Sequence, residues 1–410
     1  MKIAIAGYGL EGEQNYVYWN TPENEVTILD EKQVPDKPLP ENAKTILGPD
    51  AYNDLSEYEM VVRTAGLPPR KLVSAKKVWS ATNEFLEKCP APVIGVTGTK
   101  GKGTTSSLIA SILQAAGKNV HLVGNIGTPA LAELPNISAD DIVVYELSSF
   151  QLWDVKKSPH IAVVLGIEPD HLDVHDSMDE YVNAKANIVR FQTGSDITVF
   201  NKNNQLSRDI AQISSASLRR EYPFDLGDIA SSVKLPGRHN QENAAAALAA
   251  VMDYIKDKDA VMAGLSSFAG LPHRLKFVAE KNGVKYYDDS IATTPGSAIA
   301  ALASFEEPKV IILGGHDKGA DYTELIESCE QASATVIAIG SNGDTIERLC
   351  EEAGVPCVRE EGDMKAIVGR ARETAGEGSV VILSPAAASF DMFKSYADRG
   401  DQFITAVQEL

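Results

Sequence analysis

The stretch GVTGTKGKGTTSS, residues 95–107, follows an apolar run and leads into a helical pattern. Closely spaced glycines at such a strand-to-helix junction are typical of a loop whose backbone amides hold phosphate at a helix N-terminus. In the usual phosphate loop, Ser or Thr follows the lysine directly and ligates magnesium. Here Gly103 follows Lys102, and the hydroxyls come one residue later, at Thr104 and Thr105. The stretch predicts a phosphate cradle and leaves open what holds the metal.

The composition is that of a globular protein. The chain has 410 residues, of which 44% are hydrophobic and 23% charged, a length that suggests two or three domains. The net charge of -19 argues against a nucleic-acid partner. No apolar run is long enough to span a membrane, and the N-terminus lacks a signal-peptide pattern. Four cysteines without a CxxC pair predict reduced thiols in a cytoplasmic protein and argue against zinc.

Short apolar runs alternate with helical patterns along the chain, which predicts α/β structure with parallel sheets covered on both faces. Proline-containing or glycine-containing junctions near residues 91 and 271 divide the pattern into three α/β domains, at 1–91, 92–270 and 271–410. The first and third are expected to be Rossmann-like, and the second to carry the phosphate loop. Predicted strands include 2–7, 26–30, 60–64, 92–98, 121–124, 142–147, 161–167, 197–201, 284–289, 309–315, 335–340 and 379–385; predicted helices include 104–117 and 243–255.

A second glycine loop lies near the N-terminus. The sequence AGYGLEG contains GxGxxG at Gly7, Gly9 and Gly12, and Asp30 ends the next predicted strand. This pattern is typical of a dinucleotide site, in which the acid binds a ribose hydroxyl. The domain is too short for both halves of a dinucleotide fold, so another nucleotide diphosphate is favoured over NAD. A tight turn that needs glycine only for its geometry is the structural alternative.

Acids and histidines follow two apolar strands of the middle domain. Glu146 ends one strand, and Asp170, His171, Asp173 and His175 follow another. Because ligands bind at the carboxyl ends of strands in open α/β sheets, these residues are candidates for a magnesium-nucleotide site. For Asp173 and His175, helix capping or simple surface polarity is an equally good interpretation.

A set of motifs, in order along the whole chain, resembles the Mur ligases, and within them the branch that adds glutamate. The motifs are GTKGKGTT (98–105), GNIGTP (124–129), YELSSFQL (145–152), DHLDVH (170–175), YVNAKANI (181–188), LPGRHNQEN (235–243), LPHRL (271–275), DDSIATTP (288–295), GGHDKGAD (314–321) and SPAAASFDMFKSYADRGDQF (384–403). The GKG form of the loop also resembles folylpolyglutamate synthases of the same superfamily.

The resemblance implies ATP and magnesium, with two ions expected. It implies that Thr104, Glu146, His171 and a carbamylated Lys185 hold the metal, and that Lys102, His171, Lys185 and His273 are catalytic. The positions that it assigns to ATP are Gly98, Thr99, Lys100, Gly101, Lys102, Gly103, Thr104, Thr105, Asn240, Asn243, Arg274 and Asp289. Taken alone, Lys185 would be interpreted as a surface lysine, and Asn240 as a helix cap.

The resemblance also assigns two further sets of residues. The uridine diphosphate substrate would contact Gly9, Leu10, Glu11, Asp30, Lys32, Asn125 and Gly127, and glutamate would contact Thr293, Lys318, Ser389 and Tyr396. Three positions depart from the family pattern: Ile291 replaces a common lysine, Tyr396 a common Phe, and Glu11 a small hydroxyl residue. An acid beside a pyrophosphate is unfavourable, which puts the role of Glu11 in question.

The activity implied is ATP-dependent amide formation through an acyl phosphate. It would join D-glutamate to UDP-N-acetylmuramoyl-L-alanine in peptidoglycan precursor synthesis, with the protein acting as a monomer. Three alternatives stand beside it: another ligase of the superfamily, a non-catalytic nucleotide-binding relative, and an NAD-dependent dehydrogenase that rests on the first glycine loop alone.

Overall fold

The computed structural model describes residues 1–125, 127–316 and 319–410, and these residues form an α/β fold. Three sheets of five, six and six strands follow one another along the described chain. Neighbouring strands pair in parallel, except for the antiparallel pair of β12 and β13 in the third sheet. The predicted α/β class with mostly parallel sheets is therefore confirmed.

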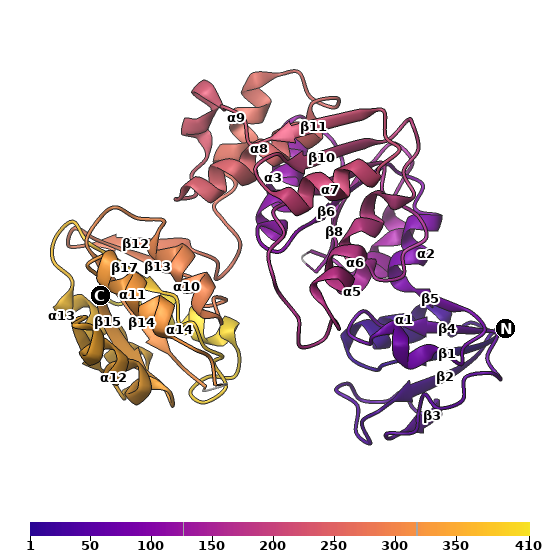
Figure 1. Cartoon of the computed structure of the whole chain (residues 1–410), viewed down its shortest axis with the longest axis horizontal. Helices are drawn as coiled ribbons and strands as arrows, with labels where there is room; N and C mark the ends of the chain where they lie inside the picture. The colour runs from indigo at the N-terminus through magenta and orange to yellow at the C-terminus, as the bar shows by residue number, and fades with distance from the viewer. Residues whose placement is uncertain (126, 317–318) are drawn as a thin grey trace. The chain divides into compact units, whose positions relative to one another are not determined.

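The chain divides into two compact units (Figure 1). The first unit comprises Met1–Ser232 and Gln241–Ser267, and contains the first two sheets. The second comprises Val233–Asn240 and Phe268–Leu410, and contains the third sheet. The domain boundaries near residues 91 and 271 stay predictions.

The first sheet has the strand order β3-β2-β1-β4-β5, and α1 packs against β1 and β2. Its central strands are buried apolar runs, as parallel sheets require. The elements of this part are β1 (Lys2–Ala6), α1 (Leu10–Trp19), β2 (Glu25–Asp30), β3 (Lys44–Leu47), β4 (Met60–Arg63), β5 (Val78–Ser80) and α2 (Ala81–Lys88).

The second sheet has the order β11-β10-β9-β6-β8-β7, which places β6 between β9 and β8. Helix α3 packs on β7, β8 and α9. The elements are β6 (Val93–Thr97), α3 (Lys102–Ala115), β7 (Val120–Gly124), α4 (Ala130–Glu133), β8 (Ile142–Glu146), α5 (Ser149–Leu152), β9 (Ile161–Val164), α6 (Met178–Arg190), β10 (Ile197–Asn201), α7 (Gln205–Ile213), β11 (Leu218–Tyr222), α8 (Arg238–Val251) and α9 (Lys258–Ser267).

The third sheet has the order β12-β13-β17-β14-β15-β16, with α13 and α14 packed together beside it. Its elements are β12 (Lys276–Lys281), β13 (Val284–Asp288), α10 (Pro295–Leu302), β14 (Lys309–Gly314), α11 (Thr323–Gln331), β15 (Thr335–Ile339), α12 (Gly343–Ala353), β16 (Cys357–Arg359), α13 (Met364–Thr374), β17 (Val380–Leu383) and α14 (Tyr396–Gln408).

Two expectations from composition can be compared with the structure. All four cysteines are free thiols, as predicted. Within the described residues, no helix combines the length and the hydrophobicity that crossing a bilayer requires.

Arg63, at the end of β4, joins the first sheet to the second. Its side chain is completely buried, and its Nε and Nη2 atoms donate to the two carboxylate oxygens of Asp154 at 2.8 and 2.9 Å. Its Nη1 and Nη2 atoms also donate to four backbone carbonyls, those of Thr64, Ala65, Leu67 and Phe150. A two-pronged pair of this kind fixes geometry as well as charge, so it holds the loop after β4 against α5.

We expect Arg63→Met to lower the free energy of unfolding by about 3–5 kcal/mol, because it leaves the Asp154 carboxylate without its cation. The double variant Arg63→Met/Asp154→Leu should recover part of this loss, since it removes the orphaned charge. Chemical denaturation of the three proteins measures both effects. Equal stability of Arg63→Met and the wild type would contradict a structural role for the pair.

Candidate active site

The phosphate loop lies at the carboxyl end of β6, and its glycines allow close packing. Gly98 and Gly101 have φ angles of 154° and 83°, a region that side chains disfavour. A Cβ on Gly101 would lie 2.5 Å from Oδ1 of Asn243, and one on Gly98 would lie 2.5 Å from Cβ of Leu165. The loop leads directly into α3, and the first turn of a helix carries backbone amides that have no intrahelical acceptor and can bind an anion.

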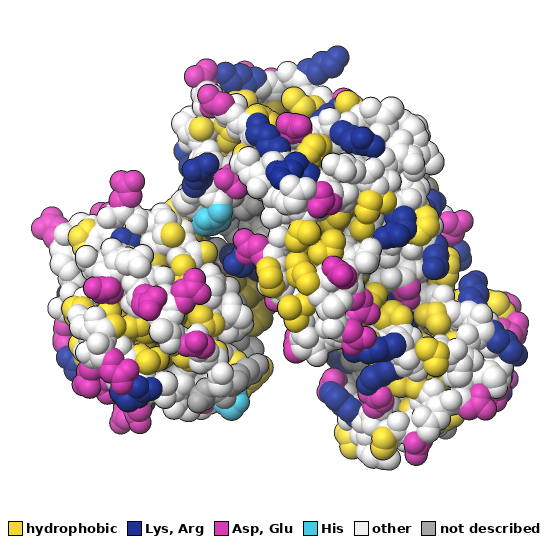
Figure 2. Space-filling view, viewed as in Figure 1, with side chains coloured by type: hydrophobic (Ala, Val, Ile, Leu, Met, Phe, Trp, Pro, Cys, Tyr) yellow, Lys and Arg dark blue, Asp and Glu magenta, His cyan; other side chains and the backbone are white. Residues whose placement is uncertain are grey.

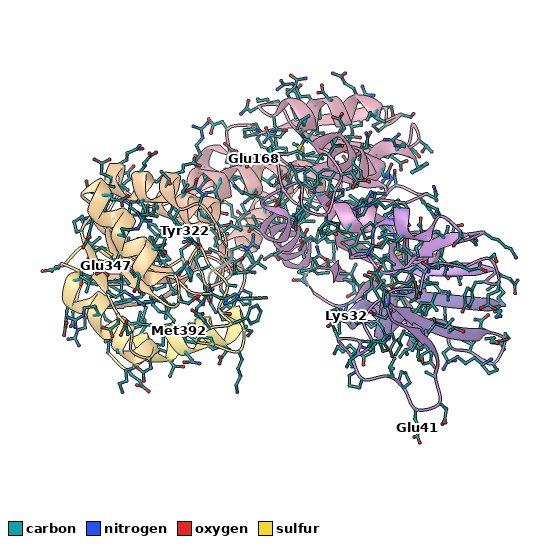
Figure 3. The ribbon with its side chains drawn as sticks, turned by 60° about the horizontal axis from the view of Figure 1, so that its bottom comes forward. Lys32, Glu41, Glu168, Tyr322, Glu347 and Met392 are labelled. Atoms are coloured by element: carbon teal, nitrogen blue, oxygen red, sulfur yellow. The ribbon has the colours of Figure 1, made fainter. Side chains whose placement is uncertain are left out.

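The side chains of the loop divide into two groups. Nζ of Lys102 donates to the carbonyls of Gly98 and Thr99, at 3.1 and 2.9 Å, so its ammonium lies over the loop. The hydroxyl of Thr99 is bonded to the backbone of Glu168 and to the Tyr181 hydroxyl, the latter at 3.0 Å. Nζ of Lys100 lies 3.3 Å from the carboxylate of Glu168, which Figure 3 labels. Thr99 therefore holds the loop in place, whereas Lys100 forms an exposed ion pair, which contributes little to stability.

Thr104 and Thr105 lie in the first turn of α3, and both are buried. The Thr105 hydroxyl donates to Oδ1 of Asn243 at 3.3 Å, which ties the start of α3 to α8. Of the two hydroxyls, this leaves Thr104 as the better candidate for a metal ligand. The structure therefore favours the ligand that the resemblance implied, and the assignment stays a prediction.

Acidic residues and histidines follow the two strands that flank β6. Glu146 ends β8 as predicted and is 5% exposed. His171 follows β9 with a φ of 53°; its side chain is half exposed, and its ring lies 4.9 Å from that of Phe150. Among the described residues, no three His, Cys, Asp or Glu side chains converge as a metal-binding group. A metal at this edge would thus need other donors, such as the Thr104 hydroxyl.

Lys185 is a buried lysine on α6 and not a surface residue, contrary to its interpretation in isolation. It is 1% exposed, and its Nζ donates to the Gly98 carbonyl at 2.8 Å. The same Nζ lies 4.6 Å from the centre of the Tyr181 ring. Burial lowers the pKa of Lys185 well below its usual value, and the charge of Lys102 lowers it further. A neutral amine with a free electron pair can react with carbon dioxide, whereas an ammonium cannot.

His175 and Asp173 differ from each other. Asp173 is exposed, as the surface interpretation predicts, but for His175 that interpretation is wrong. His175 is 1% exposed, and its ring stacks on Phe150 with centroids 5.3 Å apart. Its Nε2 lies 3.0 Å from the Ser149 hydroxyl, and burial lowers its pKa. The ring therefore packs in an aromatic cluster beside His171, and only long-range packing identifies this role.

The first glycine loop is held by two carboxylates. Asp30 accepts from the backbone amides of Tyr8 and Lys32, at 2.7 and 2.8 Å. Glu11 accepts from the amide of Ala65 at 2.8 Å; burial raises its pKa, and Arg63 opposes that rise. The carboxylate of Glu11 therefore faces the loop after β4, where the Ala65 amide and the charge of Arg63 stabilise it.

The other residues predicted at the uridine diphosphate lie on exposed segments. Leu10 is 59% exposed, and Lys32, labelled in Figure 3, forms an exposed ion pair with Asp36. Asn125 and Gly127 are exposed as well. At Gly9 a Cβ would meet no atom within 4 Å. These ligand assignments stay predictions.

In the second unit, His273 and two aspartates form a buried group. Nδ1 of His273 lies 2.7 Å from Oδ2 of Asp288, which fixes the ring. Burial raises the pKa of Asp289 to about 7. Its two oxygens accept from the Leu275 amide and the Ser384 hydroxyl, at 3.0 and 2.8 Å. Asp289 therefore joins the residue before β12 to the residue after β17.

The remaining predicted positions divide between the two units. Asn243 belongs to the first unit, and Asn240 to the second. Asn240 is not a helix cap, because α8 begins at Arg238; its side-chain amide donates to the Pro236 carbonyl. Arg274, Thr293, Ser389 and Tyr396 all lie in the second unit, and Ser389 is buried, whereas Lys318 lies outside the described residues.

A phosphate loop at the central strand of a parallel sheet, with acids at the ends of the flanking strands, defines a nucleotide-dependent α/β protein. Residues 96–224 match the model of the Mur ligase middle domain, and residues 273–387 match that of the Mur ligase, glutamate ligase domain. The chain belongs to the Mur ligase family.

Curated relatives match over the whole chain. The UDP-N-acetylmuramoylalanine--D-glutamate ligase of Clostridium kluyveri is 34% identical, over 100% of this chain and 97% of its own length. The protein of the same name from Acetivibrio thermocellus is 35% identical, over 100% and 96%. Among solved structures, the UDP-N-acetylmuramate-alanine ligase of Thermotoga maritima has the same fold, with a TM-score of 0.62 at 17% identity, over 100% and 99% of the two chains.

The packing of Gly101 against Asn243 can be tested with Gly101→Ala. Gly117→Ala is a matched control, since Gly117 has a φ of 75° and a Cβ there would meet no atom within 4 Å. Gly117→Ala should lose about 1 kcal/mol of stability, because Ala is strained at positive φ, and Gly101→Ala should lose more, because its methyl also meets Asn243. Only Gly101→Ala should raise the KM for ATP, by about tenfold or more, because its methyl displaces the phosphate loop. Similar KM values for the two variants would contradict the proposed loop function.

Proposed function

We infer that this chain is an ATP-dependent ligase that joins D-glutamate to UDP-N-acetylmuramoyl-L-alanine. The observation that carries this inference is the whole-chain similarity to relatives that bear that enzyme's name, at 34 and 35% identity. The structure supports it with a phosphate loop whose Lys102 and Lys185 meet at one carbonyl.

The reaction proceeds in two transfers. A carboxylate oxygen of the alanyl group attacks the γ-phosphorus of ATP, the bond to the β-phosphate oxygen breaks, and ADP leaves. The product is an acyl phosphate. The amino group of glutamate attacks the acyl carbon, inorganic phosphate leaves, and the nitrogen loses a proton to give the amide. The first transfer brings two anions together, so cations must neutralise the charge.

Lys102 is proposed to supply one of these cations, because its ammonium already lies over the phosphate loop. The amides at the start of α3 supply further positive charge. Magnesium, when bound, would neutralise phosphate charge and orient the oxygens. We propose Thr104, Glu146, His171 and a carbamylated Lys185 as its ligands, in a site for two ions.

His273 is proposed to act at the second transfer, with its ring oriented by Asp288. Thr293, Lys318, Ser389 and Tyr396 are proposed to bind glutamate, and Asn240, Asn243, Arg274 and Asp289 to contact the nucleotide. The first glycine loop, with Asp30, is proposed to hold the uridine diphosphate end. That the enzyme acts as a monomer is part of the same proposal.

Phosphate release tests the proposed function directly. The chain is given ATP, magnesium and UDP-N-acetylmuramoyl-L-alanine, with D-glutamate, L-glutamate, lysine or diaminopimelate added in separate reactions. We expect release only with D-glutamate. Release with a different amino acid would indicate another ligase of the superfamily, and a folded protein that is inactive with all four would indicate a non-catalytic relative.

Carbamylation of Lys185 is testable without relying on turnover. After equilibration with 13C-bicarbonate, wild-type protein should show a carbamate carbon signal by NMR, and Lys185→Ala should lack it. Lys157→Ala, which alters an exposed lysine of the same unit, should keep the signal. Lys185→Ala should also lose about a hundredfold or more in kcat, since a metal ligand is removed.

The pH dependence has a definite sign. Carbamylation needs the neutral amine, and the lowered pKa of Lys185 keeps that form populated closer to neutral pH. As the pH falls through this pKa, the amine gains a proton and the carbamate is lost. Activity at low pH should therefore increase with added bicarbonate at constant pH. Bicarbonate-independent activity across the pH range would contradict the proposal.

A further inference from the structure

Arg399, in the first turn of α14, is a fully buried arginine at the centre of the second unit's loops. Its Nε donates to the Ser290 hydroxyl at 2.9 Å, and its Nη2 to the Ser290 carbonyl at 2.8 Å. Both Nη atoms donate to the Ala387 carbonyl at 3.1 Å. The guanidinium therefore binds three neutral oxygens of two loops, one after β13 and one after β17.

Among the described residues, no carboxylate lies within ion-pair distance of Arg399, which is unusual for a buried arginine. Asp288 and Asp391 are the acids that act on it through space. Both make other contacts: Asp288 lies against His273, and Asp391 accepts from the Ser341 amide. Burial lowers the pKa of Arg399 to about 10, so the side chain remains a cation at neutral pH.

The loops that Arg399 contacts also carry residues proposed to bind glutamate. Thr293 lies three positions after Ser290, and Ser389 two positions after Ala387. The Ser290 hydroxyl donates to the carbonyl of Tyr396 at 2.8 Å. The loop after β14 packs on the same group, since a Cβ on Gly315 would lie 3.3 Å from Nη1 of Arg399.

The second unit is acidic, so a buried cation near these loops would help an anionic substrate to bind. Acidic residues outnumber basic ones in residues 271–410, and Asp and Glu are scattered over the face of the second unit seen in Figure 2. Such a surface repels carboxylates. A buried charge is screened less by salt than a surface charge, and an anion that binds nearby offsets the cost of burying it.

We propose that Arg399 is a positioning residue whose buried charge draws the carboxylates of the incoming amino acid to the loops after β13 and β17. This inference rests on the proposed function and extends it, because it assigns the selectivity for a substrate with two carboxylates to a residue that does not touch that substrate. The proposal predicts that the KM for D-glutamate depends more on the positive charge of Arg399 than on its hydrogen bonds.

Two substitutions separate charge from hydrogen bonding. Arg399→Lys keeps a cation, which Asp391 and Asp288 stabilise through space, and loses the fork, whereas Arg399→Gln keeps two donors and loses the charge. Arg348→Gln, which removes a surface charge of α12 that pairs with Glu352, controls for the net charge of the unit. Steady-state KM values for D-glutamate, ATP and the uridine substrate are measured for each protein, and thermal unfolding checks that each variant is folded.

We expect Arg399→Gln to raise the KM for D-glutamate by about tenfold or more, and Arg399→Lys by less than about threefold. The KM values for the two nucleotide substrates should stay within about twofold in both variants, and Arg348→Gln should resemble the wild type. Equal increases in the Lys and Gln variants, or an unchanged KM in the Gln variant, would overturn the proposal. If the Gln variant does not fold, Arg399→Lys decides: a KM increase of about tenfold or more in the folded Lys variant contradicts the proposal. A wild-type protein that is inactive with D-glutamate would instead refute the proposed function itself.

Discussion

The carbonyl of Gly98 accepts hydrogen bonds from two lysines, and the rest of the site depends on this arrangement. Lys102 reaches it from the start of α3, and Lys185 from α6, at 3.1 and 2.8 Å. Two amines that share one acceptor in a buried place cannot both carry a full charge at low cost. Lys102 is only partly buried, whereas Lys185 is fully buried, and burial together with the charge of Lys102 lowers the pKa of Lys185. Strand β6 lies between β8 and β9, so the strands that precede Glu146 and His171 in the chain flank the strand that carries the loop.

The sequence predicts well what is encoded locally. The phosphate loop, the buried parallel strands and the position of Glu146 at the end of β8 each follow from residues that are neighbours in the chain. The contacts of Arg63, His175 and Arg399 do not, since their partners Asp154, Ser149 and Ser290 lie 91, 26 and 109 positions away. An arginine at the end of an apolar strand signals an unusual burial, but its partner is set by how the sheets pack. Both predicted helices are present, although α8 spans Arg238–Val251, whereas the pattern predicted 243–255.

Several carboxylates that a motif assigns to a ligand also have a structural role. Asp30, Glu11 and Asp289 each accept hydrogen bonds from the protein itself, and in all three cases a backbone amide is a donor. A buried carboxylate needs such donors, because desolvation otherwise drives it to the neutral form. The raised pKa of Asp289, about 7, shows that two donors compensate its burial only in part. A motif thus identifies the position of an acid reliably, while the direction in which its oxygens point depends on distant backbone groups.

The choice of a lysine in one unit and an arginine in the other follows from how each responds to burial. Burial can take the proton from a lysine, because its usual pKa is only about three units above neutral, and the neutral amine is then a nucleophile. An arginine keeps its proton under similar burial: the pKa of Arg399 falls only to about 10. The proposed carbamylation of Lys185 depends on this neutral amine. Arg399 can only remain positive, as a site for carboxylates requires. An arginine at position 185 would not lose its proton and so could not react with carbon dioxide.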